Sequence, residues 1–264
     1  MNDSWSGGTF GERGQCILAP NPGIMSLDGT NTWVLREPGA RRSVVIDPGP
    51  LDEGHLDAVA EAAGEVATVL LTHHHYDHSE AARAFAERVG AGVRALDPEY
   101  RLGTEGLGDG DVIEVDGLEI RVVGTPGHTA DSLSFWLPAD GAVLTGDTVL
   151  GRGTTVVAHP DGELGAYLDS LDRLHALASE HGIGNVWPGH GPVIGDALRA
   201  LDYYISHRRE RLGQVEEALA RLATTPAAAD PQAIVEIVYA DVDQVLWGAA
   251  ELSVRAQLAY LAER

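Results

Sequence analysis

The sequence predicts an α/β fold, and three features of the chain favour this class. Apolar segments of strand length alternate with segments of helical periodicity over about the first two hundred of the 264 residues, and Gly, Asp and Pro separate them. The chain is 44% hydrophobic, enough to bury a large core. No stretch approaches the roughly 20 apolar residues that cross a bilayer, so we expect a cytoplasmic protein without a membrane segment.

Each element follows from its local pattern. Apolar runs bounded by turn residues predict strands at Thr32–Leu35, Ser43–Ile46, Val66–Leu71, Val112–Val115, Leu118–Val123, Leu133–Leu137, Ala142–Leu144 and Asn185–Trp187. Asp116-Gly117 suits the type I′ turn of a hairpin. Helical spacing predicts helices at about Glu53–Ala63, Ser79–Val89, Glu163–His181 and Gly195–Leu222.

A boundary is expected near residue 224. Thr224-Thr225-Pro226, three alanines and Asp230-Pro231 indicate a linker. We therefore divide the chain into a catalytic domain, 1–223, and a small helical module, 224–264. The module contains two helical segments, about Gln232–Tyr239 and Ala249–Ala262.

Composition excludes several kinds of chemistry. The net charge is −22 and all 18 positive residues are arginines, so a P-loop, a Schiff base and a pyridoxal-phosphate anchor, which each need lysine, are ruled out. So acidic a chain also repels polyanions over about 8 Å at physiological salt. Cys16 is the only cysteine, so any metal must be held by His and Asp.

A dense run of such ligands follows the apolar Val69-Leu70-Leu71. His73, His75, Asp77 and His78 lie within six residues, and imidazole and carboxylate are the ligands that zinc and other divalent metals accept. The spacing could supply two ions. A solvated His-rich turn is the alternative. His74, inside the run, is expected to face away from its neighbours.

Three further candidates follow strands through glycine-containing turns. They are His128 after Thr-Pro-Gly, Asp147 after Thr-Gly and His190 after Pro-Gly. Each alone is more often an ordinary turn residue. Together with the His-x-His-x-Asp-His run, they indicate a metal site.

With Asp47 in Val-Ile-Asp-Pro-Gly, these motifs resemble in order those of the metallo-β-lactamase superfamily. The resemblance implies a four-layer αβ/βα sandwich with the site at one edge of two packed sheets. It implies two Zn²⁺ ions, with Fe or Mn as alternatives. One would be held by His73, His75 and His128, and the other by Asp77, His78 and His190, bridged by Asp147 and a water. Asp47 would orient ligands without binding metal.

Two such ions about 3.5–4 Å apart would turn a shared water into hydroxide at neutral pH. We therefore expect a hydrolase that acts on an ester or thioester, with Asp77 also relaying a proton. Many true β-lactamases use a cysteine ligand where Asp147 stands. Antibiotic hydrolysis is accordingly not the favoured activity.

The segment Pro20–Trp33, Tyr204-Ile205-Ser206-His207-Arg208 and the C-terminal module resemble one branch, the β-lactamase-like protein 2 group. That branch includes single-strand endoribonucleases and fungal thioesterases acting on carrier-bound substrates. We expect substrate contacts from the loop at Asn31 and from Tyr204, His207 and Arg208 on one helix. A solvated helix face is the alternative.

Three alternatives remain open. The protein could be an endoribonuclease that cleaves short single-stranded RNA. It could be a persulfide dioxygenase with one iron ion. It could also be a scaffold protein without catalytic activity. The chain ends too soon after its last helix for a winged-helix hairpin, so the module is a truncated one. Its leucines, Trp247 and Tyr260 are expected to pack on the body or on a second subunit, as in a homodimer.

Overall fold

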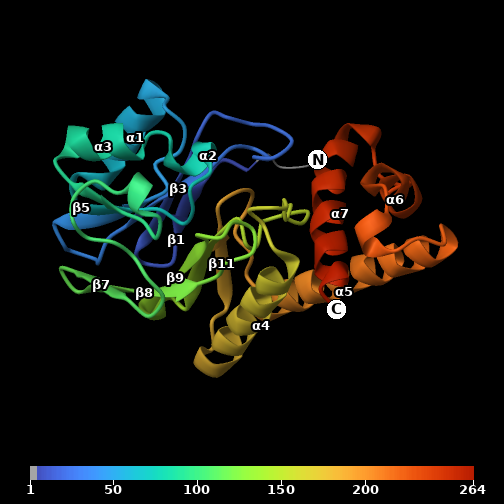
Figure 1. Ribbon diagram of the computed structural model, residues 1–264. Coiled ribbons are helices and arrows are strands. Elements are labelled where there is room, and N and C mark those ends of the chain that lie inside the picture. Colours follow the sequence, from blue (N-terminus) through green and yellow to red (C-terminus); the bar gives the residue numbers. More distant parts are fainter. Residues whose placement is uncertain (1–4) are drawn as a thin grey trace.

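The computed structural model describes residues 5–264 and contains two β-sheets that pack face to face, with helices on their outer faces (Figure 1). Apolar side chains fill three layers between these elements. This is the four-layer sandwich expected from the sequence, with a helical module at its C-terminal end.

The first sheet has six strands in the order β1-β2-β3-β4-β5-β6. Its strands are β1 (Gly8–Phe10), β2 (Gly14–Leu18), β3 (Asn31–Leu35), β4 (Arg42–Ile46), β5 (Glu65–Leu70) and β6 (Gly92–Arg94). Strands β4, β5 and β6 are parallel and the other neighbours are antiparallel. Helices α1 (Glu53–Ala63), α2 (Tyr76–Ser79) and α3 (Ala82–Val89) follow β4 and β5.

The second sheet has five strands in the order β11-β10-β9-β8-β7. They are β7 (Val112–Val115), β8 (Leu118–Gly124), β9 (Leu133–Leu137), β10 (Ala142–Gly146) and β11 (Asn185–Pro188). Helix α4 (Leu164–His181) connects the parallel pair β10 and β11. The hairpin turn at Asp116 and Gly117 has φ values of 50° and 97°, which a type I′ turn requires.

Aromatic residues join the two sheets in the central layer. Trp33 of β3 stacks on Trp187 of β11, with ring centroids 4.9 Å apart and planes 12° from parallel. The indole nitrogen of Trp33 also donates to the carbonyl of Pro188 at 3.2 Å. This contact holds the end of β11, where a predicted ligand follows, against the first sheet.

The C-terminal helices form a fourth apolar cluster with α5 (Ala197–Arg221). They are α6 (Pro231–Val238) and α7 (Trp247–Ala262). Figure 1 shows α7 standing beside α4 and α5 at one end of the sandwich. In the described part of the chain no strand follows β11. The ring of Tyr260 lies beside Gly165 of α4, whereas the indole of Trp247 donates to the carbonyls of Tyr239 and Val242 within the module. Packing against a second subunit stays a prediction.

The predicted elements are present, with changes at their ends. The helix predicted at Ser79–Val89 is α3 preceded by the single turn α2. Strands β1, β2 and β6 were not predicted; β1 and β6 have three residues each, too few for an apolar run. Four short 3-10 segments, η1 (Pro98–Tyr100), η2 (Pro138–Asp140), η3 (Pro226–Ala228) and η4 (Gln244–Leu246), complete the described chain. Among residues 5–264, no helix combines the length and apolar character needed to cross a membrane.

Candidate metal centre

The predicted ligands converge because four strands end at the same edge of the sandwich. The His run follows β5 of the first sheet, and His128, Asp147 and His190 follow β8, β10 and β11 of the second. The turn before His128 needs glycine. Gly127 has a φ of 130°, and a Cβ there would lie 2.3 Å from the backbone of Tyr167.

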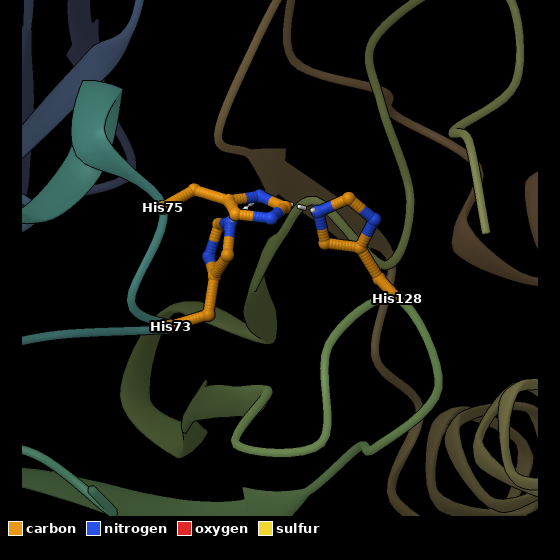
Figure 2. Close-up of side chains that lie close together, drawn as sticks. All are labelled: His73, His75 and His128. Carbon is orange, nitrogen blue, oxygen red and sulfur yellow. Dashed lines mark hydrogen bonds between the residues drawn. The ribbon is translucent and has the colours of Figure 1, made fainter. Parts of the chain in front are cut away.

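Three histidines form a first triad, His73, His75 and His128, whose rings point toward one another (Figure 2). Nδ1 of His75 lies 3.1 Å from Nε2 of His73 and 3.1 Å from Nε2 of His128. Ligands held around zinc at about 2.0–2.1 Å in a tetrahedron stand roughly 3.3 Å apart. The spacing of these nitrogens is therefore suited to one shared ion.

A second triad, Asp77, His78 and His190, lies beside the first. Nε2 of His190 lies 3.2 Å from Nε2 of His78 and 3.1 Å from Oδ2 of Asp77. The carboxylate of Asp77 is 3.8 Å from Nε2 of His78. These distances suit a second ion. These are the two groups of side chains that the family resemblance implies as ligand sets, and metal binding by each of them stays a prediction.

The carboxylate of Asp147 lies between the triads. Its Oδ2 is 3.4 Å from Nε2 of His190 and 3.7 Å from Nε2 of His128, while its Oδ1 is 3.4 Å from Nε2 of His78. Burial alone would raise its pKa, but His190 and His78 hold the pKa well below the usual range. Oδ1 is buried without a hydrogen-bond partner. A buried, ionised and incompletely bonded carboxylate calls for a nearby cation, so the donor set fits metal ions.

Hydrogen bonds fix the ring nitrogens that face the centre. Nδ1 of His128 donates to the carbonyl of Val156 at 2.8 Å, and Nδ1 of His190 to that of Gly29 at 3.1 Å. Each carbonyl can only accept, so Nδ1 carries a proton and Nε2 is the nitrogen left to bind a metal ion. The Nε2 atoms are the ones that face the two triads.

Asp47 and Thr72 fix two more rings. The hydroxyl of Thr72 donates to Oδ2 of Asp47 at 2.7 Å and so accepts from Nδ1 of His73 at 3.0 Å. Oδ2 of Asp47 also accepts from Nδ1 of His78 at 2.8 Å. Oδ1 accepts from the backbone N–H of Thr72 at 2.8 Å. Asp47 therefore hydrogen-bonds to residues of both triads or to their neighbours, and the ligand-orienting role implied by the family resemblance stays a prediction.

The two triads differ in protonation without metal. Burial lowers the pKa of His75 to about 4 and also lowers those of His73 and His128. Burial acts the same way on His190, but Asp147 and Asp77 outweigh it and raise its pKa to about 9. Without metal, protons on the histidines of the second triad therefore neutralise the carboxylates of Asp77 and Asp147. A bound metal cation would take over this role.

A cavity of about 380 Å³ opens from this centre. At the metal end it is lined by His75, Asp77, His128 and Asp147. Residues of α5 and of the C-terminal module also line it: His207, Arg208, Arg211, Tyr239, Val242 and Leu246. The module thus contributes directly to the cavity.

Two of the four residues predicted to contact substrate, His207 and Arg208, line this cavity. Tyr204 is buried, and its hydroxyl accepts from the backbone N–H of Leu150 at 2.8 Å. Asn31 is also buried, and its amide donates to the carbonyls of Pro188 and Gly191 at 2.9 and 2.8 Å. Its amide oxygen accepts from the indole of Trp5. Substrate contact by Asn31 and Tyr204 stays a prediction.

The structure also places His74 and Cys16, which lie outside the two triads. His74 lies outside both triads, with Nδ1 2.8 Å from Oδ1 of Asp131. Cys16 is buried in β2 within the central apolar layer. Sequence reasoning missed the positioning role of Thr72 and the cavity position of Arg211. Adjacency to the His run could have identified Thr72, and helical spacing from His207 could have identified Arg211.

Comparison with known proteins gives two family matches. Residues 25–205 match the metallo-beta-lactamase superfamily, and residues 231–264 match the beta-lactamase associated winged helix domain. The chain is 37% identical over 212 residues to the atrochrysone carboxyl ACP thioesterase of Aspergillus fumigatus. That match covers 77% of this chain and 64% of the relative, so the chain spans less than two thirds of the fungal protein.

The chain is also 32% identical over 220 residues to the beta-lactamase-like protein 2 homolog of Caenorhabditis elegans, covering 77% of this chain and 70% of that protein. A metallo-beta-lactamase family protein from Thermus thermophilus has the same fold, with a TM-score of 0.77, 24% identity, and coverage of 95% and 93% of the two chains. A second similar structure was solved in a di-iron-bound form, with a TM-score of 0.54, 26% identity, and coverage of 70% and 97%.

Proposed function

The chain belongs to the metallo-beta-lactamase superfamily, and we propose that it is a dinuclear zinc hydrolase acting on an ester or thioester. The observation that carries the proposal is the position of Asp147 between the two triads. One carboxylate within 3.4 to 3.7 Å of imidazoles from both triads can serve two ions at once. The two-ion proposal rests on this shared position, since Asp147 is near Nε2 of His128 in the first triad and near Nε2 of His190 in the second.

Two bound divalent ions would supply a hydroxide nucleophile at neutral pH and neutralise negative charge developing on the substrate oxygen. The chain's own residues prepare the site for them. Asp47, Thr72, Val156 and Gly29 hold four imidazoles with Nε2 facing inward. This preorganisation removes the cost of orienting the rings during the reaction.

Asp77 is the proposed proton carrier. Its side chain is 33% exposed, whereas those of His78 and His190 are fully buried. It lines the cavity, so its carboxylate lies between the buried ligands and the space for substrate. Burial would raise its pKa, but His78 and His190 outweigh this and lower the pKa to about 2. Asp77 is therefore ionised at neutral pH, and we propose that its carboxylate takes up the proton released in the reaction.

The cavity supports a small or carrier-bound acyl substrate. Leu150, Val156, Val242 and Leu246 give it apolar walls, and its volume of about 380 Å³ is in the range of small-molecule sites. The Aspergillus fumigatus relative is named as a thioesterase of an acyl carrier protein. Both points favour a thioester over a phosphodiester, and the net charge of −22 disfavours RNA.

We further propose that residues 1–223 carry the catalytic ligands and that 224–264 complete the substrate cavity. Tyr239, Val242 and Leu246 lie beyond the proposed boundary and line the cavity. A similar structure was solved in a di-iron-bound form; zinc is proposed here because imidazole and carboxylate ligands suit it.

A parallel substrate panel tests this function. S-lactoylglutathione, an acyl-CoA, a lactone, nitrocefin and single-stranded RNA are assayed with zinc-loaded protein, with and without chelator. Hydrolysis of at least one thioester or the lactone, lost with chelator, is expected. Cleavage of RNA alone would replace the proposal with a nuclease. Oxidation of a persulfide by protein that holds one iron would replace it with a dioxygenase.

A further inference from the structure

Three basic side chains of α5 line the same cavity as the metal triads. We call His207, Arg208 and Arg211 the basic cluster; the two arginines carry its charge, because burial lowers the pKa of His207 below its ordinary 6.5. The only carboxylates in the lining are those of the proposed metal ligands Asp77 and Asp147. The lining therefore combines a metal-binding group of side chains with a basic group.

The two arginines of the cluster lack acidic partners. Within residues 5–264, no carboxylate lies within 4.0 Å of the guanidinium of Arg208 or Arg211. Arg152, which also lines the cavity, contrasts with them because it pairs with Asp28 at 2.5 Å. Arg208 is only 5% exposed, and a buried charge is normally paired. The positive charges of Arg208 and Arg211 therefore have no carboxylate partner in the described chain, which leaves them available to a negatively charged ligand.

Two polar atoms of the cluster are buried without hydrogen-bond partners, Nε of Arg208 and Nδ1 of His207. One terminal nitrogen of Arg208 donates to the carbonyl of Thr155, and its guanidinium lies 5.0 Å from the centre of the Tyr167 ring. These contacts fix the group while leaving Nε unused. The guanidinium of Arg208 therefore keeps a buried N–H without a protein acceptor.

Arg211 is also held in place. One of its terminal nitrogens donates to the carbonyl of Val238 at 2.8 Å and to Oε1 of Gln214 at 2.9 Å. Its guanidinium lies 4.6 Å from the ring centre of Tyr239. The contact joins α5 to the end of α6, so the cluster is built partly by the C-terminal module.

We propose that the acyl group of the substrate carries a carboxylate that binds between Arg208 and Arg211, beside His207. The inference rests on the proposed function, since it places the ester or thioester carbonyl at the metal end. The apolar walls would contact the hydrocarbon between the two groups. A planar carboxylate matches the donor fork of a guanidinium. The acidic chain and the small cavity favour it over a phosphodiester strand.

Paired thioesters test the proposal. The octanoyl and 7-carboxyheptanoyl thioesters of N-acetylcysteamine differ only in a terminal methyl or carboxylate group. We expect a kcat/KM about tenfold higher for the carboxylated thioester, as charge-assisted hydrogen bonds give. Arg211→Gln should bring the ratio of the two kcat/KM values close to one. Arg209→Gln on the same helix, whose side chain is 67% exposed, should keep it. Equal kcat/KM values in the wild type would overturn the proposal.

A binding measurement keeps this test separate from the proposed function. Octanedioate and octanoate share one carboxylate that can meet the metals, so their affinity ratio reports the second carboxylate alone. Calorimetry on zinc-loaded protein should give about tenfold tighter binding of octanedioate, reduced by Arg211→Gln or by His207→Phe. Equal affinities would overturn the inference even if thioesters are hydrolysed. A preference for octanedioate without any hydrolysis would support the inference and contradict the proposed function.

Discussion

Oδ2 of Asp47 accepts a hydrogen bond from Nδ1 of His78 at 2.8 Å. Both side chains are buried, and the contact determines which nitrogen of His78 faces the second triad. Asp47 has a φ of 51°, a left-handed conformation that Asp and Asn tolerate better than most residues. The carboxylate also binds Thr72, so one acid supports ligands on both sides of the centre.

Asp47→Asn should weaken metal binding at the second triad. The substitution replaces Oδ2, which accepts hydrogen bonds from Nδ1 of His78 and the hydroxyl of Thr72, by an amide nitrogen. That nitrogen is a donor and cannot accept from either group. Loss of such a supporting contact typically lowers metal affinity about 10–100-fold. Competition with a chromogenic chelator measures the change. Asp57→Asn on the exposed side of α1 is the control, and equal affinity in the two variants would contradict the role of Asp47.

Asn31→Ala separates two roles of this side chain. Its amide ties the carbonyls of Pro188 and Gly191, on either side of the turn that carries His190. If positioning is its role, the variant should lose about 2 kcal/mol of stability and bind the second metal less tightly. If it contacts substrate, as predicted from the sequence, KM should rise with metal affinity unchanged. Urea unfolding, chelator competition and steady-state kinetics together decide between the roles.

Asp77→Asn should lower kcat by about 10²–10⁴, the usual contribution of a proton-transfer group. The side chain is one-third exposed, so thermal unfolding should shift little. Glu87→Gln, on the exposed face of α3, serves as the control for a lost carboxylate. A variant that retains wild-type kcat with its full metal content would show that Asp77 carries no proton.

His55 gives the metal-depleted protein a defined pH dependence. The ring is 4% exposed, and burial holds its pKa below the ordinary 6.5. The unfolded chain therefore takes up a proton on His55 at a higher pH than the folded chain does. The resulting stability is present above pH 6.5 and is lost as the pH falls through the folded pKa.

The comparison uses His55→Gln, which removes the titrating group. The difference in free energy of unfolding between wild type and variant should be constant above about pH 7 and shrink on acidification. Urea titrations in chelator measure it. A difference that stays constant down to pH 5 would show that the pKa of His55 is the same in both states.

Most strands and helices and the candidate ligands could be predicted because short sequence patterns indicate them. A strand followed by glycine and then His or Asp identifies a side chain at a sheet edge, as with His128 and His190. The two triads then followed from the family resemblance. Their actual convergence depends on which strands are neighbours, and no local pattern contains that information.

The substrate-contacting residues were harder to predict, because the sequence does not show in which direction a side chain points. Asn31 and Tyr204 were chosen by position in the chain, yet both are buried and their polar groups bind backbone. The place of Arg211 in the cavity depends on α6 and α7 packing against α5, which no local pattern shows. Strands β1 and β6 form because neighbouring strands offer hydrogen-bond partners, which short segments cannot reveal alone.

A zinc titration tests the central claim most directly. Metal-depleted protein is mixed with increasing zinc, and hydrolysis of the thioester substrate is recorded against equivalents per chain. The two triads and the shared Asp147 predict no hydrolysis without metal and a rise that is complete at two equivalents. Full activity without metal, or a plateau at one equivalent, would contradict the account.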